Sequence, residues 1–264
     1  MDVVKFIIAS YCFALGACLG SFANVLIYRL PENKSVAVPR SMCRSCGRKI
    51  PFYENIPIVS YLFLRGKCRG CGVKISYQYI LVELLVGMAA IFFAPKLLTI
   101  YALFMFLFNI LVATAFIALF VIDIRHYILP DEINISLGVL FLIFALVHHS
   151  FAFWGLGGAI GFAFPSLITY LFYVIKGQDG LGGGDIKLFG ILGLYLGPIM
   201  IIQNIFLSCL LGSILGVAFL SIGRIRRETP IPFGPFIIVV ASMQIFFPET
   251  HAKLMNFLWN ILDM

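Results

Sequence analysis

Long apolar runs separated by short polar connections make up most of this sequence. A helix needs about 20 apolar residues to cross the hydrocarbon core of a bilayer. Eight such spans are predicted, near residues 4–28, 79–95, 98–122, 133–150, 153–175, 186–201, 203–223 and 235–248. Because most connections are only a few residues long, neighbouring helices should pack antiparallel. The pattern predicts an all-α, polytopic membrane helix bundle whose first span is retained as a helix.

The one sizeable polar stretch, residues 32–78, contains two C-x-x-C knuckles. Cys43 and Cys46 form the first, Cys68 and Cys71 the second, and a glycine follows each knuckle. Four thiolates at such spacing suit a tetrahedral zinc ion, and an all-cysteine site is closed and therefore structural. Two disulfides or a redox pair are the alternatives. A reducing cytosol disfavours disulfides, and the stretch lacks the βαβ context of a thioredoxin-like redox motif.

Composition and charge distribution support this membrane interpretation. The 264 residues are 61% hydrophobic and 12% charged, which lies outside the range of soluble domains. The net charge of +7 does not indicate nucleic acid binding, because the basic residues gather on one side of the predicted membrane. With the 32–78 loop in the cytosol, sixteen of the nineteen Lys and Arg residues lie inside, including Arg224, Arg226 and Arg227. The positive-inside bias then places the amino terminus outside.

Two aspartates lie at the ends of predicted spans. Asp123 ends the third span and Asp185 begins the sixth, after three glycines. The predicted topology places both at the cytosolic leaflet. A negative charge at the carboxyl end of a helix opposes the helix dipole, so Asp123 needs another explanation. Asp185 at a helix start, and Asp131 after Pro130, have an alternative explanation as helix caps. The pair Asp123 and Asp185 is the candidate catalytic site.

Taken together, these residues resemble the type IV prepilin peptidases, a family of bacterial inner-membrane enzymes. The resemblance covers nearly the whole chain and depends on the order and spacing of several motifs. These motifs are the segment that begins with Gly20–Phe22 and ends at Pro31, the two knuckles, Glu54–Pro57, Leu64–Cys68, Val82–Leu85, Asp123 with Leu129–Asp131, Gly182–Lys187 and Ile231–Phe236. Arg44 and Ile80 stand where the family usually has proline.

The resemblance implies a bifunctional enzyme with three parts. These would be a first transmembrane helix (1–31), a cytosolic zinc-binding, methyltransferase-associated loop (32–78) and a transmembrane aspartyl peptidase bundle (79–264). Asp123 and Asp185, the latter in a G-x-G-D signature, would be the catalytic aspartates. The enzyme would cleave a prepilin or pseudopilin that has a hydrophobic N-terminal helix, at the cytosolic face of the inner membrane. It would then methylate the new amino terminus with S-adenosylmethionine.

No glycine-rich dinucleotide-type fingerprint is present to locate the S-adenosylmethionine site. Gly66 and Lys67, just before the second knuckle, are the candidate cofactor-binding residues, because they offer backbone access and a cation beside a metal-ordered turn. A turn glycine and a topological lysine explain them equally well.

Two other classes of function remain open from the residues alone. A proton-coupled transporter also uses intramembrane acids, although these usually lie near the middle of a span. A structural membrane subunit with a zinc module would use the knuckles alone. A nearby pair of carboxylates that shares one proton favours aspartyl protease chemistry.

Overall fold

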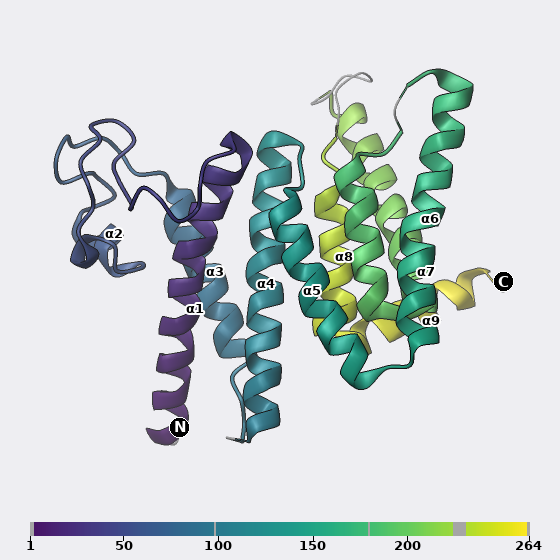
Figure 1. The fold of residues 1–264 in the computed structure, drawn as a ribbon, viewed down its shortest axis with the longest axis horizontal. Helices are drawn as coiled ribbons and strands as arrows, with labels where there is room; N and C mark the ends of the chain where they lie inside the picture. Colours follow the sequence, from purple (N-terminus) through teal and green to yellow (C-terminus); the bar gives the residue numbers. More distant parts are fainter. Residues whose placement is uncertain (1–2, 98, 179, 224–230, 263–264) are drawn as a thin grey trace. The chain divides into compact units, whose positions relative to one another are not determined.

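The computed structural model describes residues 3–97, 99–178, 180–223 and 231–262 (Figure 1). Within them the regular structure is helical, and two isolated bridges, Met42–Lys49 and Lys67–Lys74, are the only β pairing. The helices are α1 (Val3–Arg29), α2 (Val59–Phe63), α3 (Tyr77–Phe92), α4 (Ile100–His126), α5 (Asp131–His148), α6 (Phe151–Lys176), α7 (Gly183–Ser221), α8 (Gly234–Phe246) and α9 (Pro248–Leu262), with single 3-10 turns at Leu30–Glu32 and Phe52–Glu54. Five of the described helices are long and apolar enough to cross a membrane. The predicted all-α membrane fold is confirmed.

The chain divides into two compact units, Met1–Ala118 and Leu119–Met264, and the boundary falls inside α4. The predicted division at residues 31 and 78 concerns roles along the sequence, and it stays a prediction. Arg224, Arg226 and Arg227, which contribute to the predicted orientation, lie outside the described residues.

In the first unit, α1 and α3 pack closely because small residues let their backbones approach. A Cβ atom on Gly16 would lie 2.6 Å from the Ala90 Cβ. The buried amide of Asn24 donates to the Tyr79 carbonyl oxygen at 3.1 Å, and Gln78 donates to the Asn24 Oδ1 at 3.4 Å. Asn24 therefore fastens one helix to the other.

In the second unit, α7 is a tight helical hairpin. Gly197 has a φ of +72° and a ψ of 178°, which breaks the helix just before Pro198. Gly161 of α6 contacts both Phe189 and Ile201. In a continuous helix those two residues would be about 18 Å apart, so the chain must reverse at Gly197 and place both arms beside α6.

The hairpin accounts for two predicted spans, 186–201 and 203–223, although the break falls at Gly197 and not near residue 202. With the two arms counted separately, the described residues contain eight apolar helical segments, some of them short, which is close to the predicted arrangement. The amphipathic helix α9 was not predicted, because its polar residues interrupt the apolar run that a membrane span requires. It is typical of a helix that lies in the membrane interface.

Candidate active site

Asp123 lies in the last turn of α4, and its side chain is buried, with 4% of its surface exposed. The backbone N–H of Gly234, the first residue of α8, donates a hydrogen bond to Asp123 Oδ2 at 2.9 Å. The amino end of α8 carries a partial positive charge. The positive end of α8 therefore offsets the unfavourable dipole of α4. This explains how a negative charge is accommodated at the carboxyl end of α4.

Asp185 is the third residue of α7, and its side chain is partly buried. The N-cap residue of the helix is Gly182, so Asp185 does not occupy the N-cap position that the sequence suggested. One carboxylate oxygen faces the backbone of Gly182. The other, Oδ1, is buried and has no hydrogen-bond partner among the described residues. Such an oxygen is available to a water or a substrate group.

The structure brings the two aspartates together around Leu129. A Cβ atom on Gly184, next to Asp185, would lie 3.0 Å from the Leu129 Cβ. A Cβ atom on Gly234, the partner of Asp123, would lie 3.1 Å from Leu129 Cδ2. Leu129, in the loop between α4 and α5, thus lies against both the chain neighbour of Asp185 and the hydrogen-bond partner of Asp123.

A salt bridge lies beside this pair. Lys187 Nζ approaches Asp131 Oδ1 at 2.7 Å and Oδ2 at 2.8 Å, and both side chains are exposed. The residue that caps α5 is Pro130, without a side-chain hydrogen bond. The explanation of Asp131 as a cap is therefore replaced by an ion pair that links α5 to α7.

In the first unit, the four predicted zinc ligands gather in one cluster. The Sγ atoms of Cys43, Cys46, Cys68 and Cys71 lie within 4.8 Å of one another, and all four thiols are free. The Sγ atoms of Cys43 and Cys71 are 3.8 Å apart. Tetrahedral zinc with bonds of about 2.3 Å requires sulfur atoms about 3.8 Å apart, whereas a disulfide requires about 2.05 Å. The donor set and its spacing fit zinc.

The two knuckles have the same backbone design. In each, the glycine after the second cysteine has a positive φ, +68° at Gly47 and +69° at Gly72, and donates its N–H to the carbonyl oxygen of the first cysteine. Hydrogen bonds from the backbone N–H groups of Cys46 and Ser45 lower the pKa of the Cys43 thiol to about 6. A thiolate is the form that binds metal.

Glu54 joins the two knuckles. Its Oε1 accepts from Arg48 at 2.9 Å and from Arg69 at 3.3 Å. The hydrogen bond from Arg48 lowers the pKa of Glu54, with a smaller contribution from Arg69. Glu83 of α3 accepts from the Ile58 N–H at 2.7 Å, which fastens the loop to the helices of its own unit.

The candidate cofactor residues, Gly66 and Lys67, lie in a turn. Gly66 has a φ of +64° and is packed against the ring of Tyr61. Its N–H donates to the Tyr61 carbonyl oxygen, and its own carbonyl oxygen accepts from Ile75. The turn therefore explains Gly66, and the exposed ammonium of Lys67 is the group that this pair offers to a ligand.

Arg44, one of the two departures from the family pattern, has a partner of its own. Its guanidinium lies 3.8 Å from the ring centroid of Tyr28, and Tyr28 stacks on Tyr79 at 5.1 Å. The cation–π contact connects the first knuckle to α1 and α3.

Taken together, the fold and the site define a polytopic membrane protein with two aspartates gathered at helix ends and a separate four-cysteine module. Two family models match the chain, the Bacterial Peptidase A24 N-terminal domain over residues 14–97 and the Type IV leader peptidase family over residues 110–217. The chain belongs to the type IV leader peptidase family.

Curated relatives agree over most of the chain. It is 33% identical to a Prepilin leader peptidase/N-methyltransferase of Stutzerimonas stutzeri and 34% identical to one of Pseudomonas aeruginosa, each over 89% of both chains. It is 31% identical to one of Aeromonas hydrophila over 94% of both chains. No solved structure matches the chain.

Proposed function

We propose that this protein cleaves the leader peptide of prepilins or pseudopilins and N-methylates the new amino terminus. The observation that carries the peptidase function is the placement of Asp123 and Asp185 on either side of Leu129 in a chain of the leader peptidase family. The names of the relatives support both activities. A transporter is disfavoured, because the aspartates lie at helix ends rather than in the middle of spans.

Peptide hydrolysis follows from two carboxylates that share one proton. The ionised aspartate accepts a proton from water as the water attacks the scissile carbonyl carbon. The protonated aspartate donates its proton to the carbonyl oxygen and then to the leaving amine, as in aspartic proteases. Asp123, held by the Gly234 N–H, is suited to remain charged. Asp185, with one buried oxygen free of protein partners, is suited to hold the proton and meet the substrate.

The four-cysteine cluster would hold a structural zinc ion. With all four ligands from cysteine, zinc would fix the fold of the loop without an open coordination position. S-adenosylmethionine would supply the methyl group, and Lys67, in the Gly66–Lys67 turn, would contribute to binding that donor. The second activity therefore belongs to the loop and the first to the aspartates.

The proposed location is the bacterial inner membrane, with the amino terminus outside and the loop and aspartates on the cytosolic side. This orientation is supported by the sixteen-to-three distribution of basic residues. The substrate would approach through the membrane by its hydrophobic N-terminal helix, with a short leader in the cytosol.

A cleavage assay with purified protein and a prepilin tests the peptidase function. Asp123→Asn and Asp185→Asn should each reduce cleavage to background while the thermal unfolding midpoint stays close to that of the wild type. Glu132→Gln, which changes an exposed carboxylate in the first turn of α5, is the matched control and should cleave normally. Near wild-type cleavage by either Asp variant would refute the pair.

A further inference from the structure

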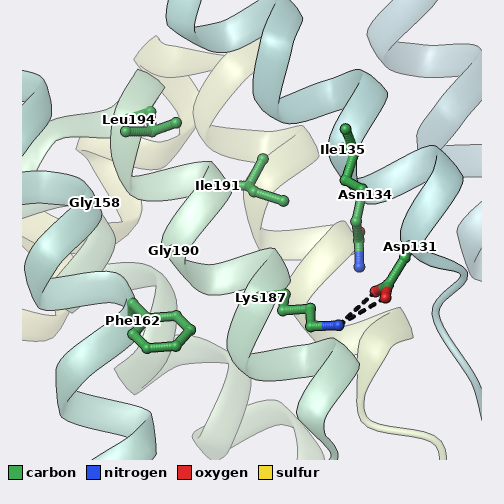
Figure 2. Close-up of a pocket in the computed structure, with 9 residues that line it drawn as sticks. All are labelled: Asp131, Asn134, Ile135, Gly158, Phe162, Lys187, Gly190, Ile191 and Leu194. Carbon is green, nitrogen blue, oxygen red and sulfur yellow. Dashed lines mark hydrogen bonds and ion pairs between the residues drawn. The ribbon is translucent and has the colours of Figure 1, made fainter.

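A pocket of about 390 Å³ lies between α5, α6 and α7, close to the aspartates (Figure 2). Its walls are mostly apolar, with Phe162 on α6 and Ile191 and Leu194 on α7. The Asp131–Lys187 ion pair lies at one end. Lys187 follows Asp185 by two residues in α7, so the pocket begins within one helical turn of the candidate site.

Asn134 of α5 is the polar side chain that this apolar pocket does not explain. It lines the pocket, and only 1% of its surface is exposed. Neither its Oδ1 nor its Nδ2 has a hydrogen-bond partner among the described residues. Figure 2 shows the Asn134 amide nitrogen pointing toward the Asp131–Lys187 pair. A buried amide without partners is costly, so a bound molecule is the partner that the site requires.

The chemistry of the amide selects the ligand. A primary amide offers donors on nitrogen and an acceptor on oxygen, which is the complement of one peptide unit. The acyl chain of a lipid offers neither group. The other buried asparagine of this unit, Asn204, already donates to Gln244 at 2.8 Å, so an unpaired amide is not a general property of these helices.

We propose that Asn134 is a positioning residue that binds a backbone peptide unit of the substrate beside the cleaved bond. The inference rests on the proposed peptidase function. A protease acts on an extended segment, so a membrane helix must unwind near the cut, and its N–H and C=O groups lose their helical partners. In a membrane each such group must be satisfied by protein. Asn134 supplies one donor and one acceptor, and the apolar walls receive the neighbouring side chains.

The kinetic test uses the full-length protein, purified and reconstituted, with a prepilin substrate. Asn134→Leu keeps the size of the side chain and removes both hydrogen bonds. With two hydrogen bonds lost, the expected fall in kcat/KM is roughly 5- to 150-fold. The loss should appear mainly as a higher KM, because the contact is made equally in the bound and transition states. Asn134→Thr, which keeps a donor and an acceptor on one oxygen, should recover part of it.

Thermal stability separates this role from a structural one. Asn134→Leu removes an amide that has no protein partner, so the unfolding midpoint should stay the same or rise. Asn204→Leu is the comparison, because it leaves the buried Oε1 of Gln244 without its donor and should lower the midpoint. A fall in the midpoint of Asn134→Leu, or wild-type kinetics in that variant, would overturn the proposal.

Crosslinking identifies the occupant. A photoreactive amino acid at Ile135, which lines the pocket, should crosslink to a labelled prepilin. The same group at Val139, one turn along α5 and also exposed, should not. Crosslinks from position 135 to lipid alone would show a lipid site and refute the proposal.

If the wild type fails to cleave, the proposed function fails; if it cleaves and Asn134→Leu cleaves equally well, only this inference fails.

Discussion

Asp123 shows how a single residue can be held at a position that its own helix disfavours. The carboxylate lies at the carboxyl end of α4, where the helix dipole opposes it by about 0.3–1 kcal/mol. The Gly234 N–H at the start of α8 offsets that cost and fixes Oδ2. We therefore expect Gly234 to act as a positioning residue; its motif is visible in the sequence, but its contact with Asp123 depends on the folded chain.

Gly234→Ala should therefore impair catalysis more than folding. The added Cβ would lie 2.8 Å from Asp123 Oδ2, so the carboxylate must move. A misplacement of about 1 Å at a reacting group can cost about 100-fold, and we expect kcat for prepilin cleavage to fall roughly 10- to 100-fold. Gly155→Ala in α6 is the control, since its Cβ would meet Phe151 only at ordinary contact distances of 3.6 Å and beyond. Equal kcat values for the two variants would contradict the assignment.

At the scale of the element, the two knuckles form a module that the sequence predicts well. Cysteine spacing and the following glycines indicate the cluster, because each knuckle is a local turn whose geometry depends on adjacent residues. The clamp by Glu54 was not predicted, since it joins residues whose approach depends on the folded loop.

Purified protein should contain about one zinc ion per chain, as four thiolates around one tetrahedral ion require. Cys43→Ser or Cys71→Ser should lower the zinc content by most of that amount and make the loop more sensitive to limited proteolysis. Elemental analysis of protein prepared under reducing, chelator-free conditions measures the first effect. Cys209→Ser, which changes a thiol outside the cluster, should keep its zinc. Metal-free wild-type protein would rule the site out.

Lys67→Ala tests the second activity. We expect methylation of a pre-cleaved pilin, followed with labelled S-adenosylmethionine, to fall at least tenfold while leader cleavage stays within twofold of wild type. Lys74→Ala, the exposed bridge partner of Lys67, is the matched control. Gly66→Val is a poor probe, because its positive φ and its contact with Tyr61 would strain the turn itself. Loss of both activities together would contradict the separation.

At the scale of the whole molecule, the sequence predicts what depends on hydropathy and local spacing. The long apolar runs predict the membrane helices, and the two aspartates are found because charge is rare in such runs. The reversal at Gly197 could not be located, because both arms of α7 are apolar and one backbone angle decides the turn. Asn134 was missed because an asparagine in the first turn of a helix is common, and only its burial without partners distinguishes it.

The two helices that begin beside the aspartates are unusually short for membrane spans. The first arm of α7, Gly183 to Leu196, is about 21 Å long and α8, with 13 residues, about 20 Å. A typical hydrocarbon core is about 30 Å thick, so hydrophobic mismatch should thin the bilayer around this part of the protein. Thinning would bring water to the carboxylates at the starts of these helices and shorten the distance that the scissile bond must move to reach them.

We therefore expect cleavage of a prepilin in vesicles of 14-carbon phosphatidylcholine to be several-fold faster than in vesicles of 22-carbon lipid, at equal protein incorporation. Equal rates in both would show that the surrounding helices, and not the lipid, compensate for the short pair.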